Sequence, residues 1–136
     1  HDFEAGHPTE LVDLLRDAGV VVLDGESHEV SGVGFAGTKG FAGGFGRSTL
    51  GSWGEPAIKQ FVQEAVTETL KLETALARLR TPQKIALLHY APIRATVEGE
   101  PLEIFPWLGC GRHAEPLVRY RVSAAFHGHA HNGCPE

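Results

Sequence analysis

A long amphipathic segment between residues 55 and 80 is the feature that most restricts the fold of this 136-residue chain. Its apolar residues recur at helical spacing and form one stripe, with the charged residues opposite, which predicts a helix with one buried face. Pro56 suits only the first turn of such a helix, and Thr81-Pro82 ends it. We expect this helix to cover one face of a β-sheet. The stripe comprises Ile58, Phe61, Val62, Ala65, Val66, Leu72, Leu76 and Leu79.

Short apolar runs on both sides of this segment predict the strands of that sheet. Asp24-Gly25 follows the first run and is a strong hairpin signal. Two shorter helices are expected at residues 8–18 and 114–120, the first between Pro8 and the cap residue Gly19. The pattern as a whole predicts an α/β fold. The expected strands are residues 20–23, 27–30, 33–35, 84–88 and 122–126.

Length and composition indicate one domain with one hydrophobic core, spanning residues 1–136. The chain is 42% hydrophobic and 21% charged, which is ordinary for a globular protein. A net charge of −5 gives no reason to expect a nucleic-acid partner, and no apolar run approaches the ~20 residues that cross a bilayer. The two cysteines, Cys110 and Cys134, form no Cys-x-x-Cys pair, so we expect reduced thiols in a cytoplasmic protein.

Nine glycines lie between residues 32 and 54, interleaved with large aromatic side chains. Residues 32–37 match the spacing of a dinucleotide-binding loop, but that loop must be followed directly by a helix. The glycine-rich residues 38–44 cannot begin a helix at reasonable cost, so we interpret the match as a coincidence. We predict instead that residues 36–53 carry little regular structure and border the candidate site as a substrate-facing flap.

Histidines follow two of the expected strands. His89 comes directly after one apolar run, and His127, His129 and His131 alternate behind another. Neutral imidazole is the commonest protein ligand for zinc-like metals. Because the carboxyl ends of parallel strands meet at one edge of a sheet, His89, His129 and His131 are predicted to converge on a metal site. We expect His127 to cap its strand or support these ligands. Three other histidines are expected at the surface: His7, His28 and His113.

Three short motifs resemble those of the calcineurin-like metallophosphoesterases. Gly128-His129-Ala130-His131 resembles the closing Gly-His-x-His motif of that family. Residues 87–92, Leu-Leu-His-Tyr-Ala-Pro, resemble the strand that delivers an isolated histidine ligand. His1-Asp2 resembles the end of the Gly-Asn-His-Asp/Glu motif. The resemblance covers nearly the whole chain and implies part of an α/β/β/α sandwich.

The resemblance also implies a reaction: hydrolysis of a phosphoric mono- or diester at a centre of two divalent ions, manganese, iron or zinc. His89 and His129 would bind one ion and His131 the other. His1 would protonate the leaving oxygen, with Asp2 orienting its ring. The family's carboxylate-bearing motifs would lie upstream of His1, and further strands would follow the last motif. We therefore expect a domain truncated at the N-terminus and at the C-terminus, whose partners are a phosphoester substrate and its own upstream part.

The alternative is a metal-binding or structural fragment without turnover. Other His-x-His enzymes fit poorly, because metallo-β-lactamases need an aspartate where Asn132 stands and amidohydrolase barrels need far more chain. Asp24 follows the Asn-His position instead of preceding it, so we interpret it as a turn residue and not as the family's Gly-Asp ligand. Three neutral imidazoles without a bridging carboxylate cannot offset the repulsion of two close cations. The chain alone is thus expected to hold one ion weakly and to be nearly inert.

Overall fold

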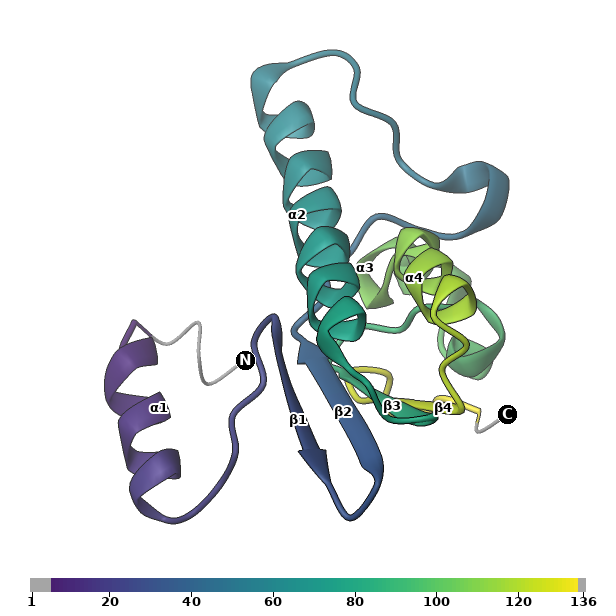
Figure 1. Cartoon of the computed structure of the whole chain (residues 1–136). Coiled ribbons are helices and arrows are strands. Elements are labelled where there is room, and N and C mark those ends of the chain that lie inside the picture. The colour runs from purple at the N-terminus through teal and green to yellow at the C-terminus, as the bar shows by residue number, and fades with distance from the viewer. Residues whose placement is uncertain (1–5, 135–136) are drawn as a thin grey trace.

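A four-stranded mixed β-sheet in the order β1-β2-β3-β4 organises the computed structural model, which describes residues 6–134 (Figure 1). β1 and β2 are antiparallel, and β2, β3 and β4 run parallel. The strands are β1 (Glu26–Val30), β2 (Val33–Thr38), β3 (Gln83–Leu88) and β4 (Ala124–His127). The helices are α1 (Pro8–Asp17), α2 (Pro56–Arg78), α3 (Phe105–Leu108) and α4 (Ala114–Arg119), with 3₁₀ turns η2 (Gly46–Ser48), η3 (Ala95–Val97), η4 (Leu102–Ile104) and η5 (Gly111–His113).

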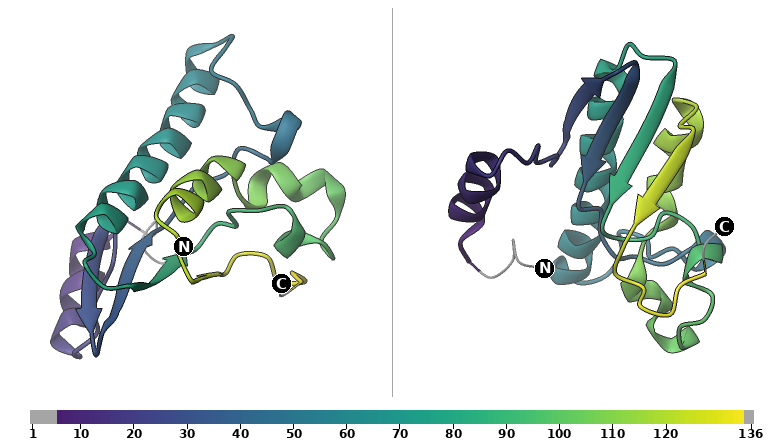
Figure 2. Two further views of the ribbon diagram at one scale, coloured as in Figure 1. Left: turned by 45° about the vertical axis from the view of Figure 1, so that its right-hand side comes forward. Right: turned by 90° about the horizontal axis from the view of Figure 1, so that it is seen from below.

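Helices α2 and α4 lie on the same face of the sheet (Figure 2). α2 connects β2 to β3 and α4 connects β3 to β4, and crossovers of one hand between successive neighbouring strands must fall on one face. The main core forms there, because the apolar stripe of α2 meets the inward side chains of the strands. Its buried members are Ala36, Leu72, Ala75, Leu76, Leu79, Ala86 and Leu88, with Leu117, Tyr120 and Val122 packed against them.

The opposite face of the sheet carries apolar side chains that stay accessible to solvent. Leu87 of β3 is in register with Phe126 of β4, so both side chains point to the same face. Leu87 is 40% exposed and Phe126 is 60% exposed. Ile85 and Ala124, paired in the same register two positions earlier, extend this surface. We call Ile85, Leu87, Ala124 and Phe126 the open sheet face.

The strands predicted at residues 27–30 and 33–35 form the β1–β2 hairpin, and its turn is Ser31-Gly32. Val30 pairs with Val33, so the loop has two residues, and these have φ values of 51° and 82°. Two successive positive φ angles are what a type I′ turn needs, and its twist matches that of the flanking strands. Gly32 adopts this conformation without the steric cost that a side chain would bring.

Replacing Gly32 with alanine is expected to lower the free energy of unfolding by roughly 1–2 kcal/mol, because an L side chain is disfavoured in the left-handed region. A Cβ at this position would meet nothing within 4 Å, so backbone strain is the only source of the loss. Urea denaturation measures the change. Gly32→Asn is the matched control, because asparagine tolerates positive φ, and an equal loss in both variants would contradict this explanation.

Most of the expected elements are present. The predicted helix at 55–80 is α2, and the helices at 8–18 and 114–120 are α1 and α4. The strands at 84–88 and 122–126 are β3 and β4, the latter shifted towards the C-terminus by two residues at its start. The α/β class is therefore confirmed as a mixed sheet with helices.

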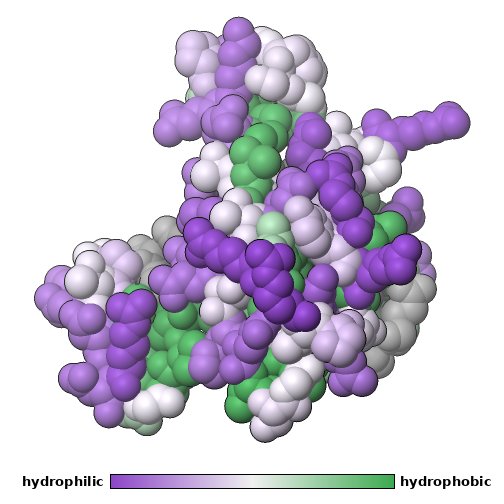
Figure 3. All heavy atoms as spheres, in the orientation of Figure 1, coloured by the Kyte–Doolittle hydropathy of each residue, from purple (hydrophilic) through white to green (hydrophobic). Residues whose placement is uncertain are grey.

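The strand predicted at residues 20–23 is wrong. These residues have no regular structure and connect α1 to the sheet (Figure 1). Val20 and Val21 are 47% and 54% exposed, and Figure 3 shows hydrophobic surface between α1 and the sheet. An apolar run becomes a strand only when a neighbour pairs with its backbone. Here the backbone of the connection first joins the sheet when the Gly25 N–H donates to the Gly37 carbonyl, 2.8 Å away.

The hairpin predicted at Asp24-Gly25 is wrong for the same reason, since the run before it is not a strand. Both residues form a bend, as expected of a turn aspartate. The Asp24 carboxylate lies 3.4 Å from the Lys71 ammonium of α2.

Among the helices within residues 6–134, none combines the length and the hydropathy that crossing a membrane requires.

Candidate functional site

His89 is fixed at the carboxyl end of β3 by backbone hydrogen bonds to the neighbouring strand's extension. The N–H groups of His89 and Tyr90 both donate to the Lys39 carbonyl, at 2.9 and 3.0 Å. Lys39 follows β2 directly, so the end of β3 and the beginning of the glycine-rich loop (residues 39–55, between β2 and α2) are tied together. The His89 side chain is half-buried at this edge.

His129 reaches the same edge from β4. It follows Gly128 in a left-handed conformation, with φ of 68°, which is uncommon for a residue with a side chain. Its ring centroid lies 4.8 Å from that of His89 and 4.5 Å from that of Tyr90. Its Nε2 is 3.2 Å from the Trp107 carbonyl, which fits an N–H donor there. Backbone strain of this kind often accompanies a side chain held for function.

The environment keeps His89 in its neutral form. Burial lowers the pKa of His89, and the neighbouring His129, His127 and Lys39 lower it further, because each adds or would add positive charge. Neutral imidazole is the form that coordinates metal. His89, in this form, lies beside His129 at the ends of neighbouring strands.

His131 lies in the turn after β4, exposed, beside the carboxylate of Glu100. Glu100 accepts hydrogen bonds from the backbone N–H of Asn132 at 2.6 Å and from its side-chain amide at 3.3 Å. These bonds lower the pKa of Glu100, and the backbone of His131 contributes to the same effect. His1 and Asp2, the expected proton donor and its partner, lie outside the described residues.

Across residues 6–134, no group of three or more His, Cys, Asp or Glu side chains is arranged to hold an ion. In this part of the chain His89 and His129 lie together, and the arrangement is not that of a complete centre of two ions.

His127 supports this edge from the last position of β4. Its Nε2 is 2.7 Å from the Thr96 hydroxyl in η3, and its Nδ1 is 2.8 Å from the Gly128 carbonyl. These contacts attach the end of β4 to the irregular segment between β3 and α4. His127 thus lies at the end of its strand, which is one of the two places expected for it.

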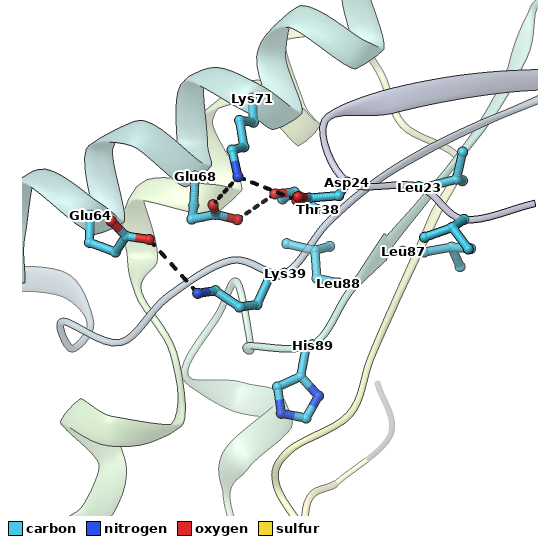
Figure 4. A pocket seen from close by; sticks show the side chains of 11 residues that line it. Leu23, Asp24, Thr38, Lys39, Glu64, Glu68, Lys71, Leu87, Leu88 and His89 are labelled. Atoms are coloured by element: carbon cyan, nitrogen blue, oxygen red, sulfur yellow. Dashed lines mark hydrogen bonds and ion pairs between the residues drawn. The ribbon is translucent and has the colours of Figure 1, made fainter. Parts of the chain in front are cut away.

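A cavity of about 460 Å³ opens beside His89, between α2 and the ends of β2 and β3 (Figure 4). Charged side chains of α2 project over it, and Figure 4 shows Lys39 reaching from the strand side towards Glu64, with 3.8 Å between the charged groups. Aliphatic side chains of the strands and of the connection before β1 form the rest of the lining. They are Val22, Leu23, Leu87 and Leu88.

Glu68 lies in the wall of this cavity and is only 1% exposed. Its carboxylate accepts hydrogen bonds from the Thr38 hydroxyl at 2.5 Å and from the Gly40 N–H at 3.1 Å, and it pairs with the Lys71 ammonium at 2.7 Å. A buried carboxylate persists only when it is paired in this way. Glu68 is absent from the predicted site, although a glutamate within the apolar stripe of α2 was a signal for it.

The prediction that His113 lies at the surface is wrong, because its side chain is fully buried. His113 belongs to η5, which packs under α2. The Phe41 N–H donates to its Nε2 at 2.9 Å, and its Nδ1 is 2.8 Å from the Thr69 hydroxyl. Nε2 also lies 3.1 Å from the Phe41 carbonyl, and Thr69 donates its own hydrogen to the Ala65 carbonyl at 2.8 Å. This arrangement satisfies both nitrogens of a neutral ring.

The predicted flap, residues 36–53, is largely irregular, except that β2 continues to Thr38 and η2 forms a single 3₁₀ turn. It borders the histidine pair at its beginning, where Lys39 contacts the backbone of His89. Its middle is held against the segment around α3 by hydrogen bonds. Gly43 N–H donates to Pro106 O, Gly44 N–H to Gly109 O, Gly111 N–H to Gly44 O and the Arg112 guanidinium to Leu50 O. No helix follows residues 32–37, which belong to the turn and to β2.

Comparison with known proteins gave no relative of this chain. No protein-family model, no curated protein and no solved structure matches it.

Proposed function

We propose that this chain carries the histidine part of the active site of a metal-dependent phosphoesterase, which hydrolyses phosphoric mono- or diesters. The observation that carries the proposal is the His89–His129 pair. The two imidazoles follow neighbouring parallel strands, and their centroids are 4.8 Å apart. The lowered pKa of His89 adds support because it favours a neutral ligand, and the left-handed backbone of His129 adds support because it favours a side chain held in place.

The motif order supports the same proposal. Residues 87–92 and 128–131, which resemble the metallophosphoesterase motifs, end adjacent strands at one sheet edge. We further propose the α/β/β/α sandwich of that family, in which a second sheet would cover the open sheet face. Apolar side chains as exposed as Leu87 and Phe126 favour such a partner layer.

Two divalent ions would supply an activated water and neutralise phosphoryl charge in such a site. Within the described residues, His89 and His129 would hold one of them, and His127 would keep the end of β4 in place. Two close cations need anionic ligands. We propose that these come from residues upstream of His1, that His1 donates the proton to the leaving oxygen, and that Asp2 orients its ring.

The test is metal binding followed by hydrolysis. Calorimetric titration of the 136-residue chain with Zn²⁺ or Mn²⁺ is expected to show at most one weak ion, and His129→Ala is expected to abolish that binding. Hydrolysis of p-nitrophenyl phosphate and its bis-ester with added Mn²⁺ is expected only from a longer polypeptide that includes the upstream part. In that polypeptide, His89→Ala or His129→Ala should reduce turnover at least 100-fold, on the order of a lost catalytic metal or acid–base group.

His28→Ala is the matched control, because His28 is an exposed histidine of β1 at the far edge of the sheet. It should leave metal binding and turnover unchanged. Metal binding that survives His129→Ala would contradict the proposed site. Robust Mn²⁺-dependent turnover by the 136-residue chain alone would show that the ligand count is wrong.

A further inference from the structure

Four aromatic side chains form a continuous surface next to the histidine pair. Phe41 lies 4.9 Å from Phe61 and 5.8 Å from Tyr90, and Phe61 lies 5.8 Å from Trp107, measured between ring centroids. They come from the glycine-rich loop, from α2, from the end of β3 and from α3. We call Phe41, Phe61, Tyr90 and Trp107 the aromatic wall.

The aromatic wall is not part of either hydrophobic core cluster. Trp107 is 59% exposed, and the other three rings are only half-buried. Burying an aromatic side chain fully contributes a large stabilising free energy. Four aromatic rings that remain accessible at one place therefore need an explanation.

The wall is joined to the histidine pair by direct contacts. Tyr90 packs against both imidazoles, with centroids 5.3 Å from His89 and 4.5 Å from His129. The Trp107 carbonyl faces His129 Nε2. A molecule whose phosphoryl group lies at His89 and His129 would therefore have its adjoining part on these rings.

The Lys39 side chain lies at the Phe41 end of the aromatic wall. The Lys39 ammonium lies 5.4 Å from the Phe41 ring centroid and 3.8 Å from the Glu64 carboxylate. The aromatic faces beside the histidines thus match a planar π-system, and the Lys39 ammonium, paired with Glu64, borders them.

We propose that the substrate is a phosphoester whose alcohol part carries a planar aromatic ring, which stacks on the aromatic wall. This inference rests on the proposed phosphoesterase function and names its substrate class. A nucleotide and an aryl phosphate both present this chemistry, whereas an alkyl phosphate offers the rings no π-face. Stacking of a base on a protein aromatic ring is sequence-tolerant, so the wall selects a ring and not a particular base.

Tryptophan fluorescence tests the proposal without requiring turnover or metal. The chain has two tryptophans, so Trp53→Phe leaves Trp107 as the sole reporter. Adenosine monophosphate and phenyl phosphate are titrated in parallel with glycerol 2-phosphate. We expect Trp107 emission to be quenched saturably by the aromatic phosphates, at concentrations at least 5-fold lower than any response to glycerol 2-phosphate. A response to only one aromatic phosphate would identify the source of the ring.

Two variants make the result specific. Phe61→Leu in the Trp53→Phe background is expected to weaken the aromatic ligands about 5-fold or more and to leave the glycerol 2-phosphate response unchanged. Trp107→Phe retains Trp53, a 70% exposed tryptophan outside the wall, whose emission should not change saturably. Equal responses to all three phosphates, or quenching of Trp53 as strong as that of Trp107, would overturn the proposal.

This test separates the two inferences. Saturable quenching with no metal-dependent hydrolysis by the longer polypeptide would reject the phosphoesterase function and keep an aromatic ligand site. Hydrolysis with equal kcat/KM for aryl, nucleotide and alkyl phosphates would keep the function and reject the stacking wall.

Discussion

Replacing Glu68 with alanine is expected to lower the free energy of unfolding by about 2–4 kcal/mol. The substitution leaves the Thr38 hydroxyl and the Gly40 N–H without their acceptor in a buried place, and it opens space under α2. Lys71 loses its nearest partner but keeps Asp24 at 3.4 Å, which limits the electrostatic part of the loss. Equilibrium denaturation in urea, followed by circular dichroism, measures the change.

Glu68→Gln and Gln63→Ala are the informative companions. Glutamine preserves the volume and one acceptor oxygen, so Glu68→Gln should lower the free energy of unfolding less than Glu68→Ala does. Gln63 is exposed on the same helix, and its replacement should change stability by less than about 0.5 kcal/mol. A Glu68→Ala variant as stable as Gln63→Ala would mean that the buried hydrogen bonds of Glu68 do not stabilise the fold.

Replacing His113 with alanine is expected to cost about 2–4 kcal/mol of stability as well, because a fully buried ring and two hydrogen bonds are lost. His113 joins three segments, since Phe41 belongs to the glycine-rich loop, Thr69 to α2 and His113 itself to η5. The loss should therefore also loosen the loop at Phe41, which hydrogen exchange of the Phe41 amide would detect. The exposed His28→Ala is the control.

The same residue predicts how the stability of the protein changes with pH. Burial lowers the pKa of His113 below its ordinary value of 6.5, and the nearby Arg112 lowers it further, whereas the Phe41 hydrogen bond and Glu68 oppose the shift. The unfolded chain then binds the proton more readily than the folded one. The contribution of neutral His113 to the free energy of unfolding is therefore fully present above about pH 6.5. It is lost as the pH decreases towards the lowered pKa.

His113→Ala should remove part of this dependence. His89 has a lowered pKa too, so a residual slope below pH 6.5 is expected in the variant and should diminish further when His89→Ala is added. Unfolding midpoints measured between pH 5 and 8 check both statements. A slope that is identical with and without His113 would contradict the buried neutral histidine.

Hydrophobic periodicity predicted those elements whose apolar residues pack in the main core. The stripe of α2 packs against Ala86 and Leu88 of β3 in the main core, so local pattern and tertiary packing agree there. The run at 20–23 has the same composition but no strand to pair with, and pairing cannot be read from one segment. The strands on both sides of Ser31-Gly32 were expected, whereas the hairpin itself was assigned to Asp24-Gly25, the stronger local signal.

The candidate site, too, was predictable from the sequence only in part. His89 and His129 were predictable because each follows an apolar run, and the ends of parallel strands meet at one edge. The burial of His113 depends on η5 packing beneath α2, and nothing within the irregular residues around it indicates that contact. The aromatic wall was equally hidden, because its four rings come from four separate segments.

The hydrogen bond between Phe41 and His113 also bears on the order in which the chain folds, since its partners stand 72 positions apart. The parallel pairing of β2 with β3 likewise waits for the whole of the glycine-rich loop and α2 to be placed. Closing such long loops costs chain entropy before any contact is gained, and this slows folding. We therefore expect α2 and the β1–β2 hairpin to form early and the edge that carries His89 and His129 to be assembled last.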